Sequence, residues 1–238
     1  MNGFVRGLVA GEGLIAHGRG EAFDYLLGER TTKFANLAII AASASLLLAR
    51  HPVISVNGNV AAICAKEIVE LGEVASALLE VNLFHRADRR ERSIEKELIK
   101  YGAGKIFGVG SRASARISEL QSERRRVDPH GIYMADLVVI PLEDGDRAEA
   151  LVEMGKKIIA MDLNPLSRTA RTAQITIVDN ITRALPAMVS VVRQLRCLKD
   201  DARLTKIVKG FNNKENLAQS LKIIQRSKNA APFSEKLQ

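Results

Sequence analysis

Short runs of consecutive apolar residues, each followed at once by polar residues, constrain the fold of this chain more than any other feature. Four runs end in polar clusters: 53–56 before 57–59, 137–142 before 143–147, 158–161 before 162–165, and 175–178 before 179–180. Apolar runs of this length without polar alternation indicate strands covered on both faces, as in a parallel sheet. Ligands of such sheets bind beyond the carboxyl ends of the strands. The four clusters therefore predict one shared binding site.

Helical patterns separate most of the expected strands. Thr31 and Thr32 offer an N-cap for a long apolar helix that ends near Arg50, and Asn59 can cap the helix that follows the first strand. Further strands are expected at 79–84 and 105–109, and helices at 22–27, 60–71, 91–101, 148–155 and 181–198. The sum predicts a three-layer α/β domain with a mostly parallel sheet.

The chain is expected to consist of one domain, 1–198, and a basic, helical C-terminal extension, 199–238. In the extension, a break at 210–213 separates two amphipathic pieces. The segment 112–132 lacks a clean period and carries three consecutive arginines, so we expect a surface loop with some helix there.

The chain is strongly basic, which limits the classes of partner it could bind but does not identify one of them. The formal net charge is +8 at pH 7, and most of the excess lies in 86–126 and 203–228. Such charge fits nucleic acid, an anionic membrane surface, small polyanions such as nucleotides, or simply solvated helix faces. Aromatic residues make up 4% of the chain, too few for a base-stacking platform. We expect small-molecule substrates, with neither nucleic acid nor a membrane as partner.

The remaining composition favours a cytoplasmic location. Cys64 and Cys197 lie far apart and neither belongs to a CxxC pair, so no disulfide framework is indicated. The most apolar stretch, 34–49, is shorter than the roughly 20 residues that span a bilayer, and predicts a buried helix. No positively charged leader precedes an apolar run at the start of the sequence.

The segment after the strand at 157–161 has the form of an anion-binding helix start. Asn164 is a good N-cap, Pro165 suits the first helical position, and Arg168 and Thr169 fall within the first turn. Backbone amides, the helix dipole and the guanidinium would converge on phosphate or carboxylate oxygens. Asp162 could contact a ribose hydroxyl or a metal-bound water. The alternative is a well-capped helix without a ligand.

Two more clusters place amides at the same edge. Asn180 ends a strand and can cap the helix that follows, and capping alone is the alternative to binding. Asn57 and Asn59 flank Gly58, whose missing side chain allows a ligand to approach the backbone.

Charged candidates complete the set. Arg19 lies between two glycines in an expected loop, which leaves its guanidinium free to bind a phosphate through two hydrogen bonds. Asp144 and Asp146 could position Mg²⁺ through water or anchor a substrate amine. A solvent-exposed loop arginine and a solvated acidic turn are the alternatives. The histidines have no partners at ligand spacing, so no protein metal site is expected.

One motif imitates a dinucleotide fingerprint. The segment 108–113 reads G-x-G-x-x-A after a strand, but it is not the first strand of the sheet and no acidic residue ends a clear next strand. Nicotinamide binding is therefore not expected. No Walker A loop, GxSxG elbow or HExxH motif is present in the sequence.

Several ordered blocks, taken together, resemble one known family. The blocks 13–32, 51–62, 141–147, 161–168 and 175–181 are similar to archaeal phosphopantothenate synthetase, also called 4-phosphopantoate:β-alanine ligase. The likeness extends from about 13 to 198. Members of that family carry an extra N-terminal helical segment with a further ATP-contacting arginine, ahead of the point where this sequence begins. That difference leaves a shortened start or a different ATP site as the two interpretations.

The resemblance implies a homodimeric, cytoplasmic, Rossmann-like ligase of coenzyme A biosynthesis. Such an enzyme condenses (R)-4-phosphopantoate with β-alanine to 4'-phosphopantothenate, using ATP and Mg²⁺ and releasing AMP and pyrophosphate through an acyl adenylate. The ATP-binding positions it implies are Arg19, Asp162, Leu163, Asn164, Arg168, Thr169, Asn180 and Ile181. Arg19 and Arg168 are also the catalytic candidates, because charge shifts between anions in the transition state.

Substrate contacts are expected from Asn57, Asn59, Asp144 and Asp146. Two other functions remain open from the residues alone. The basic charge favours a nucleic-acid-binding or regulatory module without catalysis, and the segment 108–113 would suit a nucleotide-dependent dehydrogenase.

Overall fold

A parallel sheet forms the centre of the molecule, as expected for the α/β class. The computed structural model describes residues 2–229, and its main sheet has the order β3-β2-β1-β6-β7-β8 with every neighbouring pair parallel. The strands are β1 (Pro52–Val56), β2 (Leu78–Val81), β3 (Ile106–Phe107), β6 (Leu137–Pro141), β7 (Lys157–Met161) and β8 (Ile175–Ile177). The chain builds the sheet in one direction from β1 to β3 and in the other from β6 to β8. The order therefore reverses between β1 and β6, as in a Rossmann-like fold.

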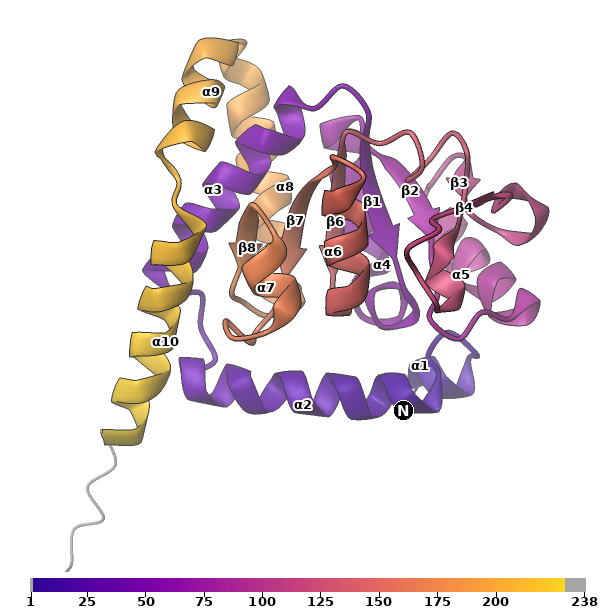
Figure 1. Cartoon of the computed structure of the whole chain (residues 1–238), viewed down its shortest axis with the longest axis horizontal. Coiled ribbons are helices and arrows are strands. Elements are labelled where there is room, and N and C mark those ends of the chain that lie inside the picture. The colour runs from indigo at the N-terminus through magenta and orange to yellow at the C-terminus, as the bar shows by residue number, and fades with distance from the viewer. Residues whose placement is uncertain (1, 230–238) are drawn as a thin grey trace, which may run out of the picture.

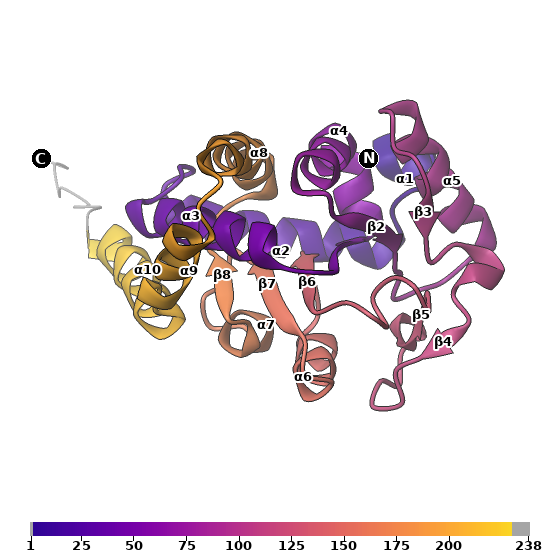
Figure 2. The ribbon, with the colours of Figure 1, turned by 90° about the horizontal axis from the view of Figure 1, so that it is seen from above.

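Helices cover both faces of this sheet (Figure 2). On one face lie α3 (Lys33–Leu48), α4 (Gly58–Ala75), α5 (Asp88–Lys100) and α8 (Ile181–Leu198), and on the other α6 (Gly145–Glu153) and α7 (Arg168–Thr172). Successive residues of one strand enter different cores. Ile159 and Met161 pack under α3, α4 and α8, while Ile158 and Ala160 pack under α6. This alternation, with apolar residues on both faces, confirms the three-layer prediction.

Helix α2 (Gly11–Leu27), preceded by the short α1 (Asn2–Val5), runs across the carboxyl ends of the strands (Figure 1). The sequence predicted a helix only over 22–27 and a loop around Arg19, and that prediction is wrong. Each glycine in a helix costs about 1 kcal/mol relative to alanine, which is why the glycine-rich half reads as a loop. Tertiary contacts override this preference: Asn59 Nδ2 donates to the carbonyl oxygen of Gly13 at 3.0 Å, and Leu27 is buried at the other end.

The C-terminal extension packs on the domain. It forms α9 (Asp201–Gly210) and α10 (Asn213–Asn229), which confirms the expected break between two helices. In α10, Leu217 and Ile224 are buried in one cluster with Leu27 of α2, while Asn216 Nδ2 donates to the carbonyl oxygen of Thr176 in β8 at 2.8 Å. The division at 198 stays a prediction, and residues 230–238 of the extension lie outside the described part of the chain.

The segment 112–132 contains more order than a surface loop. It follows the 3-10 turn η1 (Gly110–Arg112) and holds a second 3-10 turn, η2 (Glu123–Arg125), and an antiparallel ribbon of β4 (Ala115–Arg116) and β5 (Arg126–Val127). Ile117, Leu120 and Val127 bury their side chains in the α6 core. Strands of two residues are too short to leave a pattern in the sequence.

The apolar stretch at 34–49 forms the buried helix α3, as expected. Among residues 2–229, no helix combines the length and apolar character needed to cross a membrane.

Candidate active site

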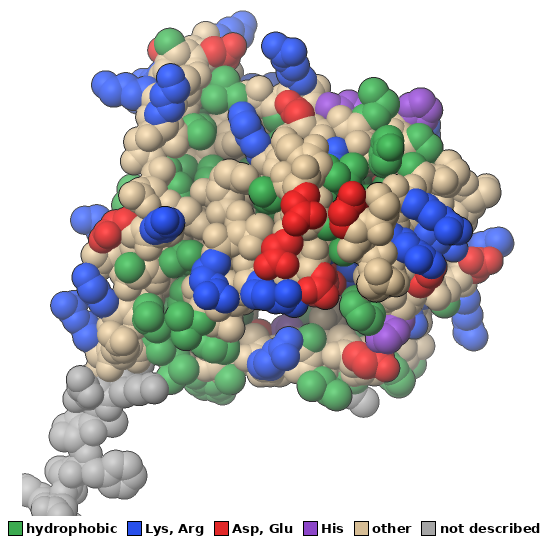
Figure 3. Space-filling model, in the orientation of Figure 1, with side chains coloured by type: hydrophobic (Ala, Val, Ile, Leu, Met, Phe, Trp, Pro, Cys, Tyr) green, Lys and Arg blue, Asp and Glu red, His purple; other side chains and the backbone are tan. Residues whose placement is uncertain are grey.

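A cavity of about 820 Å³ lies between α2 and the carboxyl edge of the sheet. Figure 3 shows it as a hollow above α2, flanked by acidic and basic side chains. Its walls come from one side of α2 and from the turns that follow β1, β2, β6 and β7. The cavity thus opens where the strand order reverses, the usual ligand position in sheets of this topology.

Most of the residues expected from the sequence line this cavity. They are Arg19, Asn57, Asn59, Asp144, Asp162, Leu163, Asn164, Arg168 and Thr169. Three expected residues do not line it: Asp146, Asn180 and Ile181. Ile181 is 2% exposed in the core, and Asn180 donates from Nδ2 to Glu21 and Asp24 of α2 at 3.1 and 2.9 Å. The fourth polar cluster therefore supports α2 from beside the cavity.

The turn after β7 differs from its predicted form. Asn164 Oδ1 accepts from the amide of Leu166 at 2.9 Å, so Asn164 makes a local turn and does not cap the helix. The N-cap is Ser167, whose side chain accepts from the amide of Ala170, and α7 starts only at Arg168. Asp162 organises this turn by accepting from the amide of Asn164 at 2.9 Å and from the Ser167 hydroxyl. Burial raises the pKa of Asp162, although these donors and the Arg19 charge oppose that rise.

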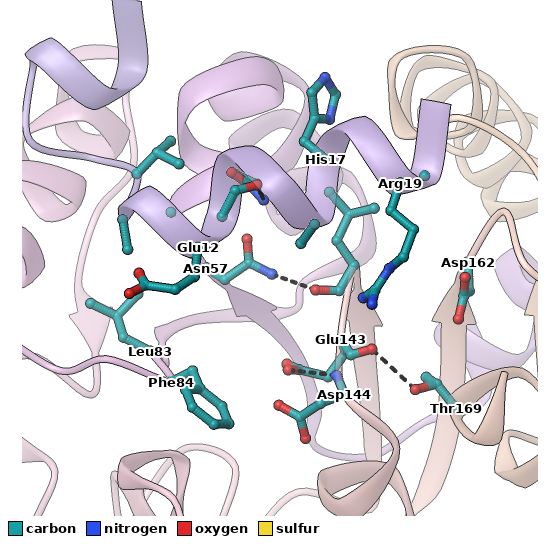
Figure 4. Close-up of a pocket in the computed structure, with 18 of the residues that line it drawn as sticks. Glu12, His17, Arg19, Asn57, Leu83, Phe84, Glu143, Asp144, Asp162 and Thr169 are labelled. Carbon is teal, nitrogen blue, oxygen red and sulfur yellow. Dashed lines mark hydrogen bonds between the residues drawn. The ribbon is translucent and has the colours of Figure 1, made fainter. Parts of the chain in front are cut away.

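Arg19 and Arg168 approach the cavity from opposite walls. Figure 4 shows Arg19 reaching down from α2 into the space between Glu143 and Asp162. Among the residues described, no carboxylate lies within ion-pair distance of Arg19. Arg168 instead pairs with Asp146 at 2.5 Å and Glu149 at 3.5 Å, and its side chain is 54% exposed.

Gly145, at the start of α6, allows Arg168 to sit this close. A Cβ atom added at Gly145 would lie 2.5 Å from Cβ of Arg168 and 3.0 Å from its Nε. The Cβ atom is fixed to the backbone, so it cannot move away as freely as the end of a long side chain can. Any residue larger than glycine at 145 would therefore displace the start of α7.

The floor of the cavity is a buried network of charges that the sequence did not reveal. Glu143, whose side chain is 1% exposed, lies between Arg124 and Arg147 and pairs with both. Arg147 Nη1 also donates to Ser55 Oγ at 2.9 Å, and Arg124 Nε lies 2.9 Å from Asp144 Oδ2. Burial raises the pKa of Glu143 and lowers the pKa of Arg124, and the opposite charge of each partner opposes both shifts.

Asn57 and Asn59 brace the site through their side chains. Asn57 Nδ2 donates to the carbonyl oxygens of Pro141 and Leu142 at 2.9 and 3.1 Å, and its Oδ1 accepts from the amide of Val60. Asn57 is thus the N-cap of α4, and the predicted cap Asn59 is wrong because the helix begins at Gly58. Asn59 ties α4 to α2. Both amide hydrogens of Asn57 are engaged within the chain, which favours a positioning role.

A buried glutamate anchors the segment that carries Arg124. Glu80 in β2 is fully buried and accepts from the amides of Asp128 and Ile132 at 3.0 and 2.6 Å. Asn82 donates to the carbonyl oxygen of Arg124 at 3.2 Å. Burial, the largest influence, raises the pKa of Glu80 to about 7, although the two amides lower it.

Glu80 is expected to make the stability of the protein pH-dependent near neutrality. An unfolded glutamate titrates near 4.5, so between that value and about 7 the folded state holds a proton that the unfolded state has released. Stability should therefore fall as pH rises through this window, by roughly 3 kcal/mol if the full shift is expressed. Denaturant unfolding at pH 5 and pH 8 measures the difference, which Glu80→Gln should largely abolish.

Glu73→Gln, at an exposed position of the neighbouring α4, is the matched control and should keep the wild-type slope. Parallel pH profiles for wild type and Glu80→Gln would show that Glu80 does not titrate in this range.

Several lining residues gave no signal in the sequence. Leu83, Phe84 and His85 follow β2, Arg90 lies in the first turn of α5, and Arg124 lies in the segment between β3 and β6. The three consecutive arginines at 124–126 were visible, but nothing in the pattern placed one of them at this edge. The G-x-G-x-x-A segment, 108–113, does not line the cavity.

Comparisons with known proteins agree on one family. The family model described as phosphopantothenate/pantothenate synthetase matches residues 34–227. The chain is 54% identical to a 4-phosphopantoate--beta-alanine ligase of Thermococcus kodakarensis over 93% of its own length and 84% of the relative. It is 49% identical to the ligase of that name from Methanosarcina mazei, over 94% of its own length and 87% of the relative.

Proposed function

The chain belongs to the phosphopantothenate/pantothenate synthetase family, and from that premise we propose that it is a ligase joining 4-phosphopantoate to β-alanine in coenzyme A biosynthesis. The product contains a new carbon–nitrogen bond, an amide. The observation that carries the proposal is the near-full-length identity to relatives named for this reaction. The cavity at the strand reversal, lined by arginines, supports a site for the reaction there.

ATP is proposed as the substrate that activates the acid, because a free carboxylate does not react with an amine unaided. The residues present fit a nucleoside triphosphate. Arg19 faces the cavity without an ion-pair partner among residues 2–229, and Arg168 and Thr169 bring the start of α7 to the opposite wall. Thr169 is itself held by its hydroxyl, which donates to the carbonyl oxygen of Glu143 at 3.1 Å. Asn180 and Ile181 remain proposed contacts, and neither lines the cavity in this conformation.

The proposed chemistry has two displacements. A carboxylate oxygen of phosphopantoate attacks the α-phosphorus of ATP, pyrophosphate leaves, and an acyl adenylate forms. The β-alanine nitrogen then attacks the acyl carbon, AMP leaves with the bonding electrons, and the amine loses a proton. Both attacking carboxylate and phosphates are anionic, so the protein must supply fixed positive charge. Arg19 and Arg168 are proposed in that role.

Mg²⁺ is proposed to arrive on the ATP phosphates. Asp144 and Asp146 are both engaged by arginines, Arg124 and Arg168 respectively, and would contact the ion only through water. Within residues 2–229, no group of three or more His, Cys, Asp or Glu side chains is arranged to hold a metal.

A homodimer and a cytoplasmic location complete the proposal. The outward face of α2 supports self-association, because Ile15 and Tyr25 are 76% and 70% exposed. Small residues lie between and beside them at spacings of three and four: Gly11, Gly18 and Ala22. In an antiparallel pair about Gly18, Tyr25 would face Gly11 of the second copy. Sedimentation equilibrium would report a monomer mass if this is wrong.

One incubation tests the function directly. Wild-type protein with ATP, Mg²⁺, 4-phosphopantoate and β-alanine should yield 4'-phosphopantothenate and AMP, identified by mass spectrometry. ADP in place of AMP would replace adenylation by acyl-phosphate chemistry. Absence of the amide product would refute the ligase. The comparisons favour the ligase over a non-catalytic nucleic-acid-binding module, which would instead shift DNA or RNA without turnover.

A further inference from the structure

The cavity has a second cationic end, away from the proposed ATP residues. Figure 4 shows Leu83 and Phe84 on the opposite side of Asn57 from Asp162. His85 follows Phe84 directly, and Arg90 Nη1 donates to the carbonyl oxygen of His85. Both His85 and Arg90 line the cavity. We call this group of residues, Leu83, Phe84, His85 and Arg90, the β2 end.

Charge pairing separates the arginines of the cavity into two classes. Arg124 and Arg168 each pair with carboxylates. Arg19 and Arg90 have no carboxylate within ion-pair distance in the described part of the chain. An uncompensated guanidinium facing a cavity attracts an anion and can bind phosphate through two parallel hydrogen bonds. The cavity therefore offers two separate anion sites.

The wall of the β2 end carries apolar side chains next to Glu12. Leu8, Val9 and Leu83 are buried, and the ring of Phe84 is 47% exposed beside them. 4-Phosphopantoate, the acid in the name of the relatives, carries a charged group next to an apolar one, as the β2 end does. Its 4-phosphate is attached next to a carbon that bears two methyl groups, and its reacting carboxylate lies at the other end of the molecule.

The orientation of that acid follows from its two charges, and this step depends on the proposed function. Its carboxylate must meet ATP, which is proposed to lie by Arg19 and Arg168. Its phosphate then points toward the β2 end, with the two methyl groups against Leu83 and Phe84. We propose that Arg90, with His85 beside it, binds the 4-phosphate and makes the enzyme selective for phosphopantoate over pantoate.

The His85 ring lies between a carboxylate and an aromatic ring. Its Nε2 lies 3.9 Å from Oε2 of Glu12, and its ring stacks edge-on against Phe84 with centroids 4.9 Å apart. The ring is thus held at the mouth of the β2 end, where a protonated imidazole would add a second donor for a phosphate.

The test compares Arg90→Met with wild type using phosphopantoate and pantoate as alternative acids at saturating ATP and β-alanine. Methionine keeps an apolar stem of similar length and removes only the charged head. KM for phosphopantoate should rise roughly 10- to 100-fold, the range for losing hydrogen bonds to a charged group. The ratio of kcat/KM for phosphopantoate over pantoate should fall by the same factor, while KM for ATP changes less than threefold.

Arg92→Met is the matched control, because Arg92 is exposed on the same helix and does not line the cavity. It should behave as wild type. An unchanged ratio in Arg90→Met, or a rise in KM for ATP alone, would overturn the proposal while leaving the ligase intact. Wild type that makes no amide from phosphopantoate would instead overturn the proposed function itself.

A second variant covers the case in which Arg90→Met does not fold, as judged by circular dichroism. His85→Gln should also raise KM for phosphopantoate, by about 3- to 10-fold, with KM for ATP unchanged. Equal KM values for His85→Gln and wild type would then count against the assignment.

Discussion

Glu143→Ala is expected to lower the free energy of unfolding by about 3–5 kcal/mol, the usual cost of removing one member of a buried ion pair. The carboxylate of Glu143 is buried between Arg124 and Arg147, and the side chain of Arg147 has no exposed surface. Removing it leaves the guanidinium of Arg147 buried without a carboxylate partner, and leaves Arg124 paired with Asp144 alone. Urea unfolding followed by circular dichroism measures the change.

Glu153→Ala is the matched control for this experiment. Glu153 is the exposed last residue of α6, the helix that follows Glu143, and its removal should change stability by less than about 0.5 kcal/mol. Replacing Arg124, Glu143 and Arg147 together by apolar residues of similar size should recover much of the loss, because no charge remains buried. A loss below about 1 kcal/mol in Glu143→Ala would mean that water reaches the two arginines.

Arg19→Ala should reduce kcat about 10²- to 10³-fold, the typical loss for one well-placed charge-stabilising donor. Arg19 is exposed and has no ion-pair partner in the described part of the chain, so its removal should leave the unfolding midpoint unchanged. Arg168→Ala should lose a similar factor. The measurement is AMP release at saturating substrates.

Arg30→Ala serves as the control for this pair, because Arg30 is exposed just after α2 and does not line the cavity. It should retain wild-type turnover. If Arg19→Ala and Arg168→Ala each lose less than threefold in kcat, neither arginine stabilises the transition state.

The sheet could be predicted from the sequence because its strands are apolar on both faces. The strand at 157–161 and the helix at 181–198 have the predicted bounds, and the strand expected at 79–84 ends early, at Val81. Residues 82–84 are apolar or buried for another reason: Asn82 anchors a neighbouring segment and Leu83 lines the cavity. The glycine-rich part of α2 could not be predicted, because a tertiary contact from Asn59 to Gly13 holds it and local propensity does not.

The candidate site could be predicted where strand ends supply the residues. Asn57, Asp144, Asp162 and Arg168 follow strands and line one cavity, as the pattern of polar clusters indicated. Arg90 directly precedes the helix expected at 91–101, whereas Arg124 belongs to a segment without a period, and the position of Arg124 depends on contacts with residues far away in the sequence. Hydrogen bonds from Asn82 to the carbonyl oxygens of Arg124 and Arg126 are of that kind.

Helix α2 is fixed at both of its ends, which decides how substrates reach the site beneath it. Near its start, Asn59 holds Gly13, and toward its other end Asp24 pairs with Arg183 at 2.5 Å. At its last residue, Leu27 packs against Leu217 and Ile224 of α10. Because both ends of α2 are held, the helix should not rotate away from the sheet as a lid would. ATP and the acid should therefore enter the cavity along the two sides of α2, one from each side.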